Sequence, residues 1–338
     1  MNYGKKGVRA KQKALNSKSQ KWGRKLALTC VKIMLAAVVG IGICGVAAGI
    51  GVFRGILSST PTIRLSDVVA VGEATIVYDK EGNEIDQYVS TNSNRLSVGM
   101  DEIPDYMGKA FVAIEGERFY QHNGIDFKSI LRAGYQFLKT GGEEAQGAST
   151  ITQQLLKNTV FTDWTSEGSN KIKKIKRKIQ EQYLALEITK YYSKDEILLR
   201  YMNAINLGQN TLGVESASLR YFGKHCSDLT ISECAVIASI TQNPSKYNPI
   251  RHPEENAKRR ETCLKKMLEL GFISQAQYDE AVADTDAVYE RIGLYDIDYQ
   301  EANATTGSYF SDAVYEQVKQ DLILSGYNEA MAETLITY

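Results

Sequence analysis

The most restrictive feature of this sequence is an uncharged apolar stretch from Ile33 to Phe53, which reads IMLAAVVGIGICGVAAGIGVF. As a helix rising about 1.5 Å per residue, its 21 residues match the ~30 Å hydrocarbon core of a bilayer. A helix also satisfies its backbone hydrogen bonds internally, which a segment in lipid must do. The stretch therefore predicts a single transmembrane helix.

Charge is distributed unevenly around this stretch. Ten of the 40 Lys and Arg residues precede Arg54, whereas none of the 40 Asp and Glu residues does. Positive charge stays on the cytoplasmic side of a span, so we expect a cytoplasmic N-terminus and an extracytoplasmic remainder, held at the cell membrane. The alternative is a cleaved signal peptide, whose apolar core is normally only about 7–15 residues long. The longer core favours a retained anchor.

Composition excludes several other classes of protein. Aromatic residues make up 9% of the chain, which argues against a wholly disordered protein. No basic patch is interleaved with aromatic side chains, so we expect no nucleic-acid partner. The five cysteines show no CxxC spacing, so neither a disulfide framework nor a zinc site follows.

The region after the apolar stretch is predicted to be mainly α. Residues 74–89 alternate apolar and polar side chains around a turn, which indicates a small β-hairpin near the membrane. A helix is expected from Pro104 to Ile114, ended by Gly116. A second helix should follow the N-cap candidate Asp126, with apolar or small residues at Phe127, Ile130, Leu131, Gly134 and Leu138. Further helical patterns cover 171–222, 230–241, 253–270 and 274–283, and loops are expected at 141–147 and 163–170.

A first candidate motif runs from Ala113 to Asp126 and reads AIEGERFYQHNGID. Its Glu115 lies at the end of an apolar helix beside aromatic residues, where desolvation can raise the proton affinity of a carboxylate. Such a group can act as a general base or acid. From spacing alone, a surface glutamate on a helix is an equally simple interpretation.

A second candidate motif, GASTITQQLLKN at residues 147–158, can begin a helix capped by Ser149 or Thr150. The free N–H groups of that helix, its amides and Lys157 could bind an anion. An ordinary polar helix start is the alternative.

A third motif, KIKKIKRKIQEQYLALEITK, covers Lys171 to Lys190. Arg177 and Glu181 are spaced to pair on one face, away from the packing stripe. A cationic face directed at a phosphate leaving group is the functional interpretation, and a solvated charged face is the alternative.

In this order the three motifs resemble the glycosyltransferase domain of the class A penicillin-binding proteins, family 51 of the glycosyltransferases. The resemblance spans roughly residues 74–270 and continues through Tyr201-Met202-Asn203, Gly213-Val214-Glu215-Ser216-Ala217, Tyr221-Phe222-Gly223-Lys224, Tyr247-Asn248-Pro249 and Arg259-Arg260. It implies a bilobal, lysozyme-like, mostly helical domain that polymerises lipid II into peptidoglycan glycan strands.

The resemblance also implies roles for individual residues. Glu115 takes the position of the catalytic base and Glu181 that of the second essential glutamate, which organises the donor phosphates and is the candidate ligand for Mg²⁺ or Mn²⁺. Lys157, Arg177 and Lys178 would neutralise the departing undecaprenyl pyrophosphate. The expected cleft lining is Ser149, Thr150, Gln153, Gln154 and Asn158. The implied partners are lipid II, the growing glycan strand, membrane lipid and other cell-wall synthesis proteins, and no organic cofactor is expected.

Two positions depart from the family pattern. Gly116 stands where an Asp usually follows the base, and Thr189 stands where a Glu is common, with Glu187 nearby. The chain also lacks the ordered Ser-x-x-Lys, SxN and KTG motifs of a transpeptidase, so a truncated bifunctional protein is expected in preference to a native monofunctional transglycosylase. The alternatives are a lysozyme-like muramidase or lytic transglycosylase, which also uses a single Glu, and a catalytically weakened membrane scaffold.

These observations together give a domain plan. It comprises a basic cytoplasmic tail (1–25), a transmembrane anchor (26–56), a membrane-proximal linker with the hairpin (57–100), the glycosyltransferase domain (101–285), and a linker towards an absent transpeptidase domain (286–338).

Overall fold

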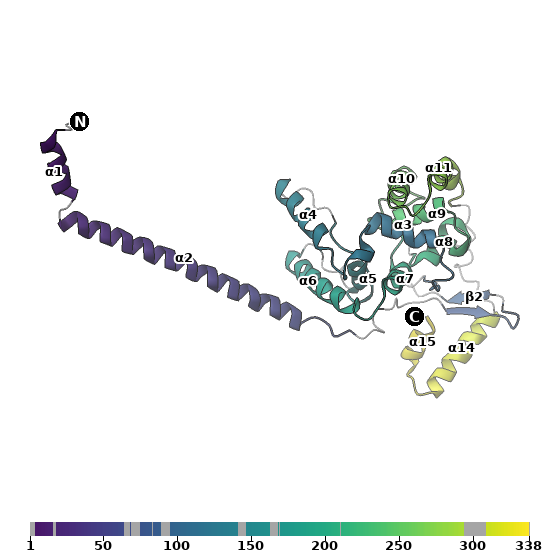
Figure 1. Ribbon diagram of the computed structural model, residues 1–338. Helices are drawn as coiled ribbons and strands as arrows, with labels where there is room; N and C mark the ends of the chain where they lie inside the picture. Colours follow the sequence, from purple (N-terminus) through teal and green to yellow (C-terminus); the bar gives the residue numbers. More distant parts are fainter. Residues whose placement is uncertain are drawn as a thin grey trace. The chain divides into compact units, whose positions relative to one another are not determined.

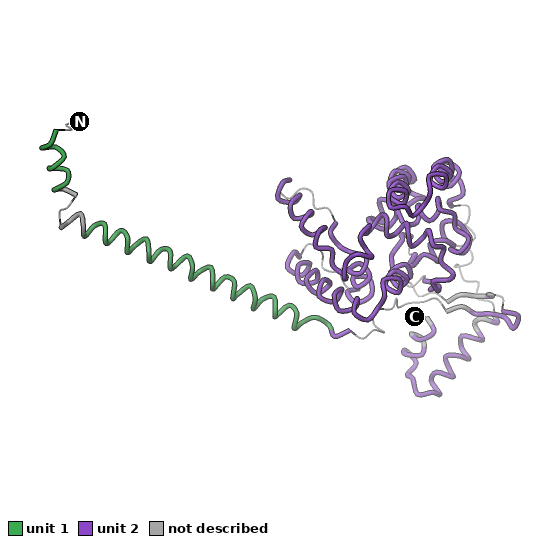
Figure 2. The backbone as a smooth tube through the Cα atoms, viewed as in Figure 1, with its two compact units in different colours: residues 1–61 green, residues 62–338 purple. Residues whose placement is uncertain are grey.

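The computed structural model describes residues 4–15, 18–63, 68, 75–82, 84–88, 95–140, 147–162, 168, 170–209, 211–293 and 309–337. Most of the two predicted loops, and residues 294–308 of the predicted C-terminal linker, lie outside the described residues. The chain divides into two compact units, residues 1–61 and 62–338 (Figure 2).

The N-terminal unit consists of two helices, α1 (Lys5–Leu15) and α2 (Lys18–Ser58) (Figure 1). Within α2, residues Trp22–Ser58 include a window of mean hydropathy 2.5 whose side chains are not buried by the protein. By length and composition, this helix can cross a membrane. It is compatible with the predicted anchor, and it extends beyond the uncharged stretch at both ends.

The second unit contains one small antiparallel sheet. Strands β1 (Thr75–Tyr78) and β2 (Glu84–Tyr88) pair with Thr75 opposite Tyr88 and Val77 opposite Asp86. Gly82 lies in the intervening turn with φ of 87°, a conformation that glycine adopts without steric cost. The hairpin predicted at residues 74–89 is therefore confirmed.

The rest of the second unit is helical. Its helices are α3 (Asp105–Glu115), α4 (Phe127–Lys139), α5 (Ile151–Thr159), α6 (Lys171–Ile188), α7 (Lys194–Ala204), α8 (Val214–Phe222), α9 (Ile231–Ser239), α10 (Pro253–Glu269), α11 (Gln275–Ala283), α12 (Thr285–Glu290), α14 (Tyr309–Leu324) and α15 (Glu329–Thr337). Pro104 and Asp126 precede α3 and α4, as the sequence predicts. The mainly α prediction is confirmed for the described residues.

The helical pattern predicted over 171–222 is divided into three helices. Ser193 begins α7 with a capping box, in which its hydroxyl accepts from Glu196 N and the Glu196 carboxylate accepts from Ser193 N. Gly213 precedes α8 with φ of 86°, and a Cβ there would lie 2.9 Å from the Asn203 carbonyl oxygen. Both breaks reflect local backbone requirements that the apolar periodicity does not contain.

The core surrounds α3, the helix that carries Glu115. Met107, Ala110, Phe111, Val112 and Ala113 of α3 are buried. The helix packs against α9 and α10, and the Phe111 ring meets the Tyr201 ring of α7 edge-on at 5.6 Å. This packing fixes the end of α3 in the middle of the domain.

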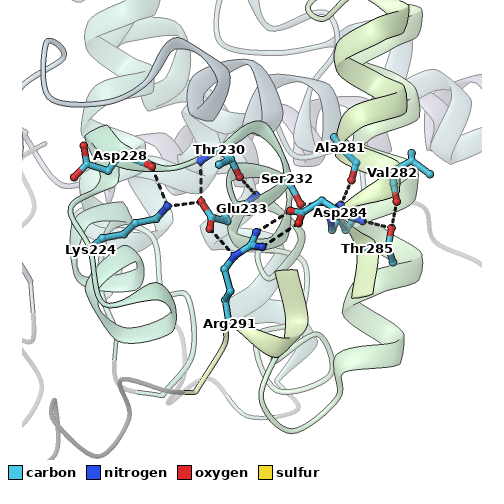
Figure 3. A network of polar contacts seen from close by, with 11 residues as sticks. Lys224, Asp228, Thr230, Ser232, Glu233, Ala281, Val282, Asp284, Thr285 and Arg291 are labelled. Atoms are coloured by element: carbon cyan, nitrogen blue, oxygen red, sulfur yellow. Dashed lines mark hydrogen bonds and ion pairs between the residues drawn. The ribbon is translucent and has the colours of Figure 1, made fainter. Parts of the chain in front are cut away.

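A polar network ties α9 to the helices that follow it (Figure 3). Glu233 of α9 is almost fully buried and pairs with Lys224 at 2.8 Å and with Arg291 at 3.2 Å. Arg291 also forms two hydrogen bonds to Asp284, at 2.9 and 2.7 Å. Because a buried charge is costly without partners, the network holds these segments in one arrangement.

Arg260 of α10 belongs to the same framework, and its replacement by Met is expected to destabilise the fold. It is 1% exposed, and its guanidinium donates to Ser232 Oγ, Thr285 Oγ1 and the Ala281 carbonyl. Arg260→Met would leave these acceptors unpaired, at a cost of about 3 kcal/mol. Urea unfolding would measure the loss, and Lys265→Met, at an exposed position of α10, should cost little. Equal stability of the two variants would contradict the assignment.

Candidate active site

Glu115 is the last residue of α3, and its side chain is only 12% exposed. Its Oε2 atom accepts a hydrogen bond from Gln154 Nε2 at 2.8 Å. Its Oε1 atom accepts from Thr241 Oγ1 at 2.5 Å and from an Arg259 guanidinium nitrogen at 3.0 Å. The carboxylate is therefore held on both oxygens, by α5, by the segment after α9, and by α10.

A chain of hydrogen bonds orients the Gln154 amide towards Glu115. Burial, reinforced by the Glu115 charge, raises the pKa of Tyr201 well above its usual value, so its hydroxyl remains a donor. That hydroxyl donates to Gln154 Oε1 at 3.1 Å, which leaves the amide nitrogen to donate to Glu115.

The start of α5 is built by Thr150 and Gln153. Thr150 caps the helix, and its hydroxyl also donates to the Gly124 carbonyl at 2.6 Å. The Gln153 side chain accepts from Thr150 N at 2.8 Å and is 2% exposed. Gln153 therefore serves the capping box, which does not suit the predicted cleft-lining role, whereas Thr150 does line a cavity.

Two cavities are lined by Glu115 or by its hydrogen-bond partners. The larger, of about 660 Å³, is lined by Gln154, Lys157 and Asn158 of α5 and by residues after α7 and α9, Thr241 among them. The smaller, of about 180 Å³, is lined by Glu115, Ser149 and Thr150. Glu115 thus borders one cavity while two of its hydrogen-bond partners border the other.

A cluster of charges surrounds Glu181 on α6. The Glu181 side chain is fully buried, and its Oε1 atom pairs with Arg177 while its Oε2 atom pairs with Lys178 Nζ at 2.7 Å. Lys178 Nζ also donates to Ser149 Oγ at 2.9 Å, which links α6 to the start of α5. The pairing predicted between Arg177 and Glu181 is confirmed.

Lys157 connects this cluster electrostatically to Glu115. Burial lowers the pKa of Lys157, and the positive charges of Lys178 and Arg177 lower it further, while Glu181 and Glu115 oppose the shift. Lys157 thus interacts electrostatically with Glu115 and with the charges of the Glu181 cluster.

The two departures from the family pattern have different surroundings. A Cβ at Gly116 would lie 3.8 Å from Ile151 and 3.9 Å from Phe119, which is ordinary van der Waals contact. Thr189 caps the end of α6, and its hydroxyl donates to the Ala185 carbonyl at 3.0 Å. Nearby Glu187 pairs with Lys190 at 2.6 Å, away from the Glu181 cluster.

His122, in the first motif, lies in the loop between α3 and α4 and lines the smaller cavity. Burial, together with the nearby charge of Lys194, lowers its pKa to about 4. The imidazole is therefore neutral near pH 7, which suits a packing role.

Glu181 does not offer a suitable ligand set for Mg²⁺ or Mn²⁺ in this arrangement. Each of its oxygens faces a cationic side chain, whereas these metals require carboxylate oxygens directed at the ion. Among the described residues, no group of three or more His, Cys, Asp or Glu could hold a metal ion.

The motif analysis did not identify Thr241 and Arg259 as site residues. Arg259 was noted only as half of the Arg259-Arg260 pair, and Thr241 follows a helix with no distinguishing pattern. The chain separation from Glu115 is 126 residues for Thr241 and 144 for Arg259, so only the fold brings them together.

Comparison with known proteins gives consistent matches. The sequence profile described as transglycosylase matches residues 81–268. Penicillin-binding protein 1A of Clostridium perfringens (strain 13 / Type A) is 38% identical over 296 residues, 84% of this chain and 42% of that protein. Penicillin-binding protein 1A/1B of Bacillus subtilis (strain 168) is 34% identical over 319 residues, 93% of this chain and 33% of that protein.

The chain therefore spans less than half the length of these relatives. Among solved structures, penicillin-binding protein 1A from Haemophilus influenzae aligns with 22% identity and a TM-score of 0.34, over 63% of this chain and 20% of that one.

Proposed function

Because the chain belongs to the transglycosylase family, we propose that it is a peptidoglycan glycosyltransferase that polymerises lipid II into β-1,4 glycan strands. The observation that carries the proposal is that α5 presents Gln154, bound to Glu115, and Lys157 to one cavity, and that Lys157 interacts electrostatically with both Glu115 and the Glu181 cluster. A base beside a group of cations suits a reaction in which a hydroxyl attacks while a pyrophosphate leaves.

In the proposed reaction, Glu115 removes the proton from the 4-hydroxyl of the acceptor GlcNAc. That oxygen attacks C1 of the donor's terminal MurNAc on the face opposite the leaving group. The C1–O bond to undecaprenyl pyrophosphate breaks, so the anomeric configuration inverts, and the proton remains on Glu115 until solvent accepts it. The hydrogen bonds from Gln154, Thr241 and Arg259 keep the carboxylate in position for this transfer.

Lys157, Arg177 and Lys178 would balance the negative charge that develops on the departing pyrophosphate. The positions of Arg177 and Lys178 are fixed before substrate binds, because both pair with the buried Glu181 and Lys178 also donates to Ser149. Fixed charges of this kind stabilise a transition state without reorganising during the reaction. Glu181 thus has an organising role for Arg177 and Lys178.

A membrane-surface location is supported by two features. One is α2, which is apolar and long enough to span a bilayer. The other is α4, whose apolar side chains are exposed, with Phe127 at 66%, Leu131 at 73% and Leu138 at 81%. An amphipathic helix with an uncovered apolar face suits the lipid interface. We accordingly assign the bilobal, lysozyme-like domain to the outer surface of the cell membrane, where a polyprenyl substrate is held.

The test is polymerisation of lipid II by the full-length chain in detergent, with a moenomycin-type inhibitor as control. Inhibitor-sensitive glycan strands would support the proposal. Release of fragments from purified cell wall, without polymerisation, would instead indicate the muramidase reaction.

The alternative of a catalytically weakened scaffold can be tested at Gly116, where the family usually has an Asp. The backbone φ of Gly116 is −171°, extended backbone that any residue adopts, and the position has room for a Cβ. Gly116→Ala should therefore raise the free energy of unfolding by about 0.4–1 kcal/mol, and Gly116→Asp should fold. Thermal unfolding would measure both effects. A wild-type protein that is inactive, and that Gly116→Asp does not activate, would favour the scaffold.

A further inference from the structure

Two donors from distant parts of the chain meet on one oxygen of Glu115. Thr241 lies just after α9, and Arg259 lies in α10. Both contact Oε1, whereas Gln154 contacts Oε2. Two residues both contact Glu115 and line the larger cavity, namely Gln154 and Thr241. Of these, Thr241 carries a hydroxyl, which can act both as donor and as acceptor.

Arg259 is held in place independently of Glu115. Its Nε donates to the Ser239 carbonyl at 3.1 Å, and one terminal nitrogen donates to Gln242 Oε1 at 2.8 Å. Its guanidinium also lies 5.2 Å from the centre of the Tyr247 ring. The remaining terminal nitrogen is thereby aimed at Glu115, so the arginine supplies a fixed positive partner.

Thr241 has one hydroxyl proton and two nearby acceptors. Its Oγ1 atom lies 2.5 Å from Glu115 Oε1 and 3.0 Å from the Ala238 carbonyl oxygen. A hydroxyl donates one hydrogen bond but can accept another. The shorter contact is the one expected while Glu115 is ionised, because charge-assisted hydrogen bonds are the shorter and stronger ones.

We propose that Thr241 is a positioning residue whose hydrogen bond to Glu115 reverses direction when Glu115 is protonated. The hydrogen bond from Arg259 to Glu115 stays the same in both states. While Glu115 is ionised, Thr241 donates to it. When Glu115 takes the proton of the acceptor hydroxyl, the carboxylic acid donates to Thr241 Oγ1, and the threonine proton turns to the Ala238 carbonyl. No proton leaves Thr241 in this exchange. The inference rests on the proposed role of Glu115 as the base.

Several other ionisable groups face Glu115 or line its cavity. They are Lys157 of α5, Tyr201 of α7, Arg259 and Cys263 of α10, and the cavity-lining Glu117, Arg118, His122, Asp126, Arg132 and Lys266. Burial raises the pKa of Cys263 to about 12 and raises the pKa of Tyr201 well above its usual value. At Asp126 burial is outweighed by hydrogen bonds from Arg118 and Ser129, which lower the pKa of Asp126 to about 2, whereas burial lowers the pKa of His122 to about 4. His122 and Glu117 are therefore the groups to separate from Glu115 in the acidic limb of the pH–rate profile, by His122→Gln and Glu117→Gln.

The test compares Thr241→Val, which keeps the shape and removes the hydroxyl, with Thr241→Ser, which keeps the hydroxyl. In full-length protein in detergent, we expect Thr241→Val to move the acidic limb of kcat/KM for lipid II to higher pH by about one unit. The sign follows because the ionised base loses a charge-assisted hydrogen bond, which is stronger than the neutral one that the protonated acid loses. Thr241→Ser should restore the wild-type limb, and Thr262→Val, at an exposed hydroxyl of α10, should not move it. If the acidic limb of Thr241→Val lay at the same pH as that of the wild type, the proposal would be overturned.

A second readout separates this inference from the proposed function. If the wild-type protein does not polymerise lipid II, the proposed function fails, but the contact can still be measured by ¹³C NMR titration of the Glu115 carboxyl, assigned by its absence in Glu115→Gln. A higher titration midpoint in Thr241→Val than in wild type supports the hydrogen-bond exchange. Coincident midpoints exclude it.

Discussion

Glu115→Gln is expected to slow the polymerisation of lipid II by about 10³-fold while the protein remains folded. The amide has nearly the shape of the carboxylate, but it cannot accept the proton of the attacking hydroxyl. Its oxygen can still accept from Thr241 and Arg259, whereas its nitrogen would face the Gln154 amide. We therefore expect a loss of only about 1 kcal/mol in the free energy of unfolding.

The matched control is Glu261→Gln, the same change at an exposed position of α10. Rates measured with fluorescent lipid II, together with thermal unfolding of each variant, would distinguish lost chemistry from lost structure. Full activity in Glu115→Gln would refute the assignment of the base. An equal loss in both variants would show that the effect is not specific to the site.

The sequence predicts the elements of this fold better than their junctions. Pro104, Asp126 and the turn of the hairpin are local signals, and the structure places element boundaries at each of them. The region 171–222 was harder to divide, because Ser193 and Gly213 interrupt it through a cap and a close backbone approach. Helical periodicity gives no information on either requirement.

Some residues of the candidate site could be predicted from local sequence, and others could not. Glu115, Lys157, Arg177 and Glu181 lie in motifs whose internal spacing is visible along the chain. Thr241 and Arg259 act on Glu115 across more than a hundred residues, so their contribution depends on how α9 and α10 pack against α3. Gln153 shows that a residue inside a recognisable motif can also serve the helix start, through the capping box with Thr150.

The exposed face of α4 shows a further limit of pattern analysis. The spacing of Phe127, Leu131 and Leu138 correctly predicts an apolar face on a helix that follows Asp126. It does not reveal what covers that face, and the structure leaves these side chains exposed. For the proposed polyprenyl substrate, lipid is a covering of suitable chemistry.

Lys157→Met is expected to lower the kcat of polymerisation by about 10²-fold, through loss of a positive charge near the departing pyrophosphate. The substitution should not destabilise the fold. Burial and the charges of Lys178 and Arg177 lower the pKa of Lys157, so keeping this lysine charged costs folding free energy at neutral pH. Methionine has a similar length and carries no charge.

Lys157→Arg distinguishes the charge of this side chain from its shape. Because the pKa of Lys157 lies below its usual value of 10.5, the wild-type enzyme should lose activity on the alkaline side at a lower pH than an ordinary lysine would dictate. Arginine stays charged throughout this range, so Lys157→Arg should move the alkaline limb to higher pH. Lys176→Met, at an exposed position of α6, should leave both limbs in place. If Lys157→Met polymerised lipid II at the wild-type rate, the leaving pyrophosphate would have to be stabilised by Arg177 and Lys178 alone.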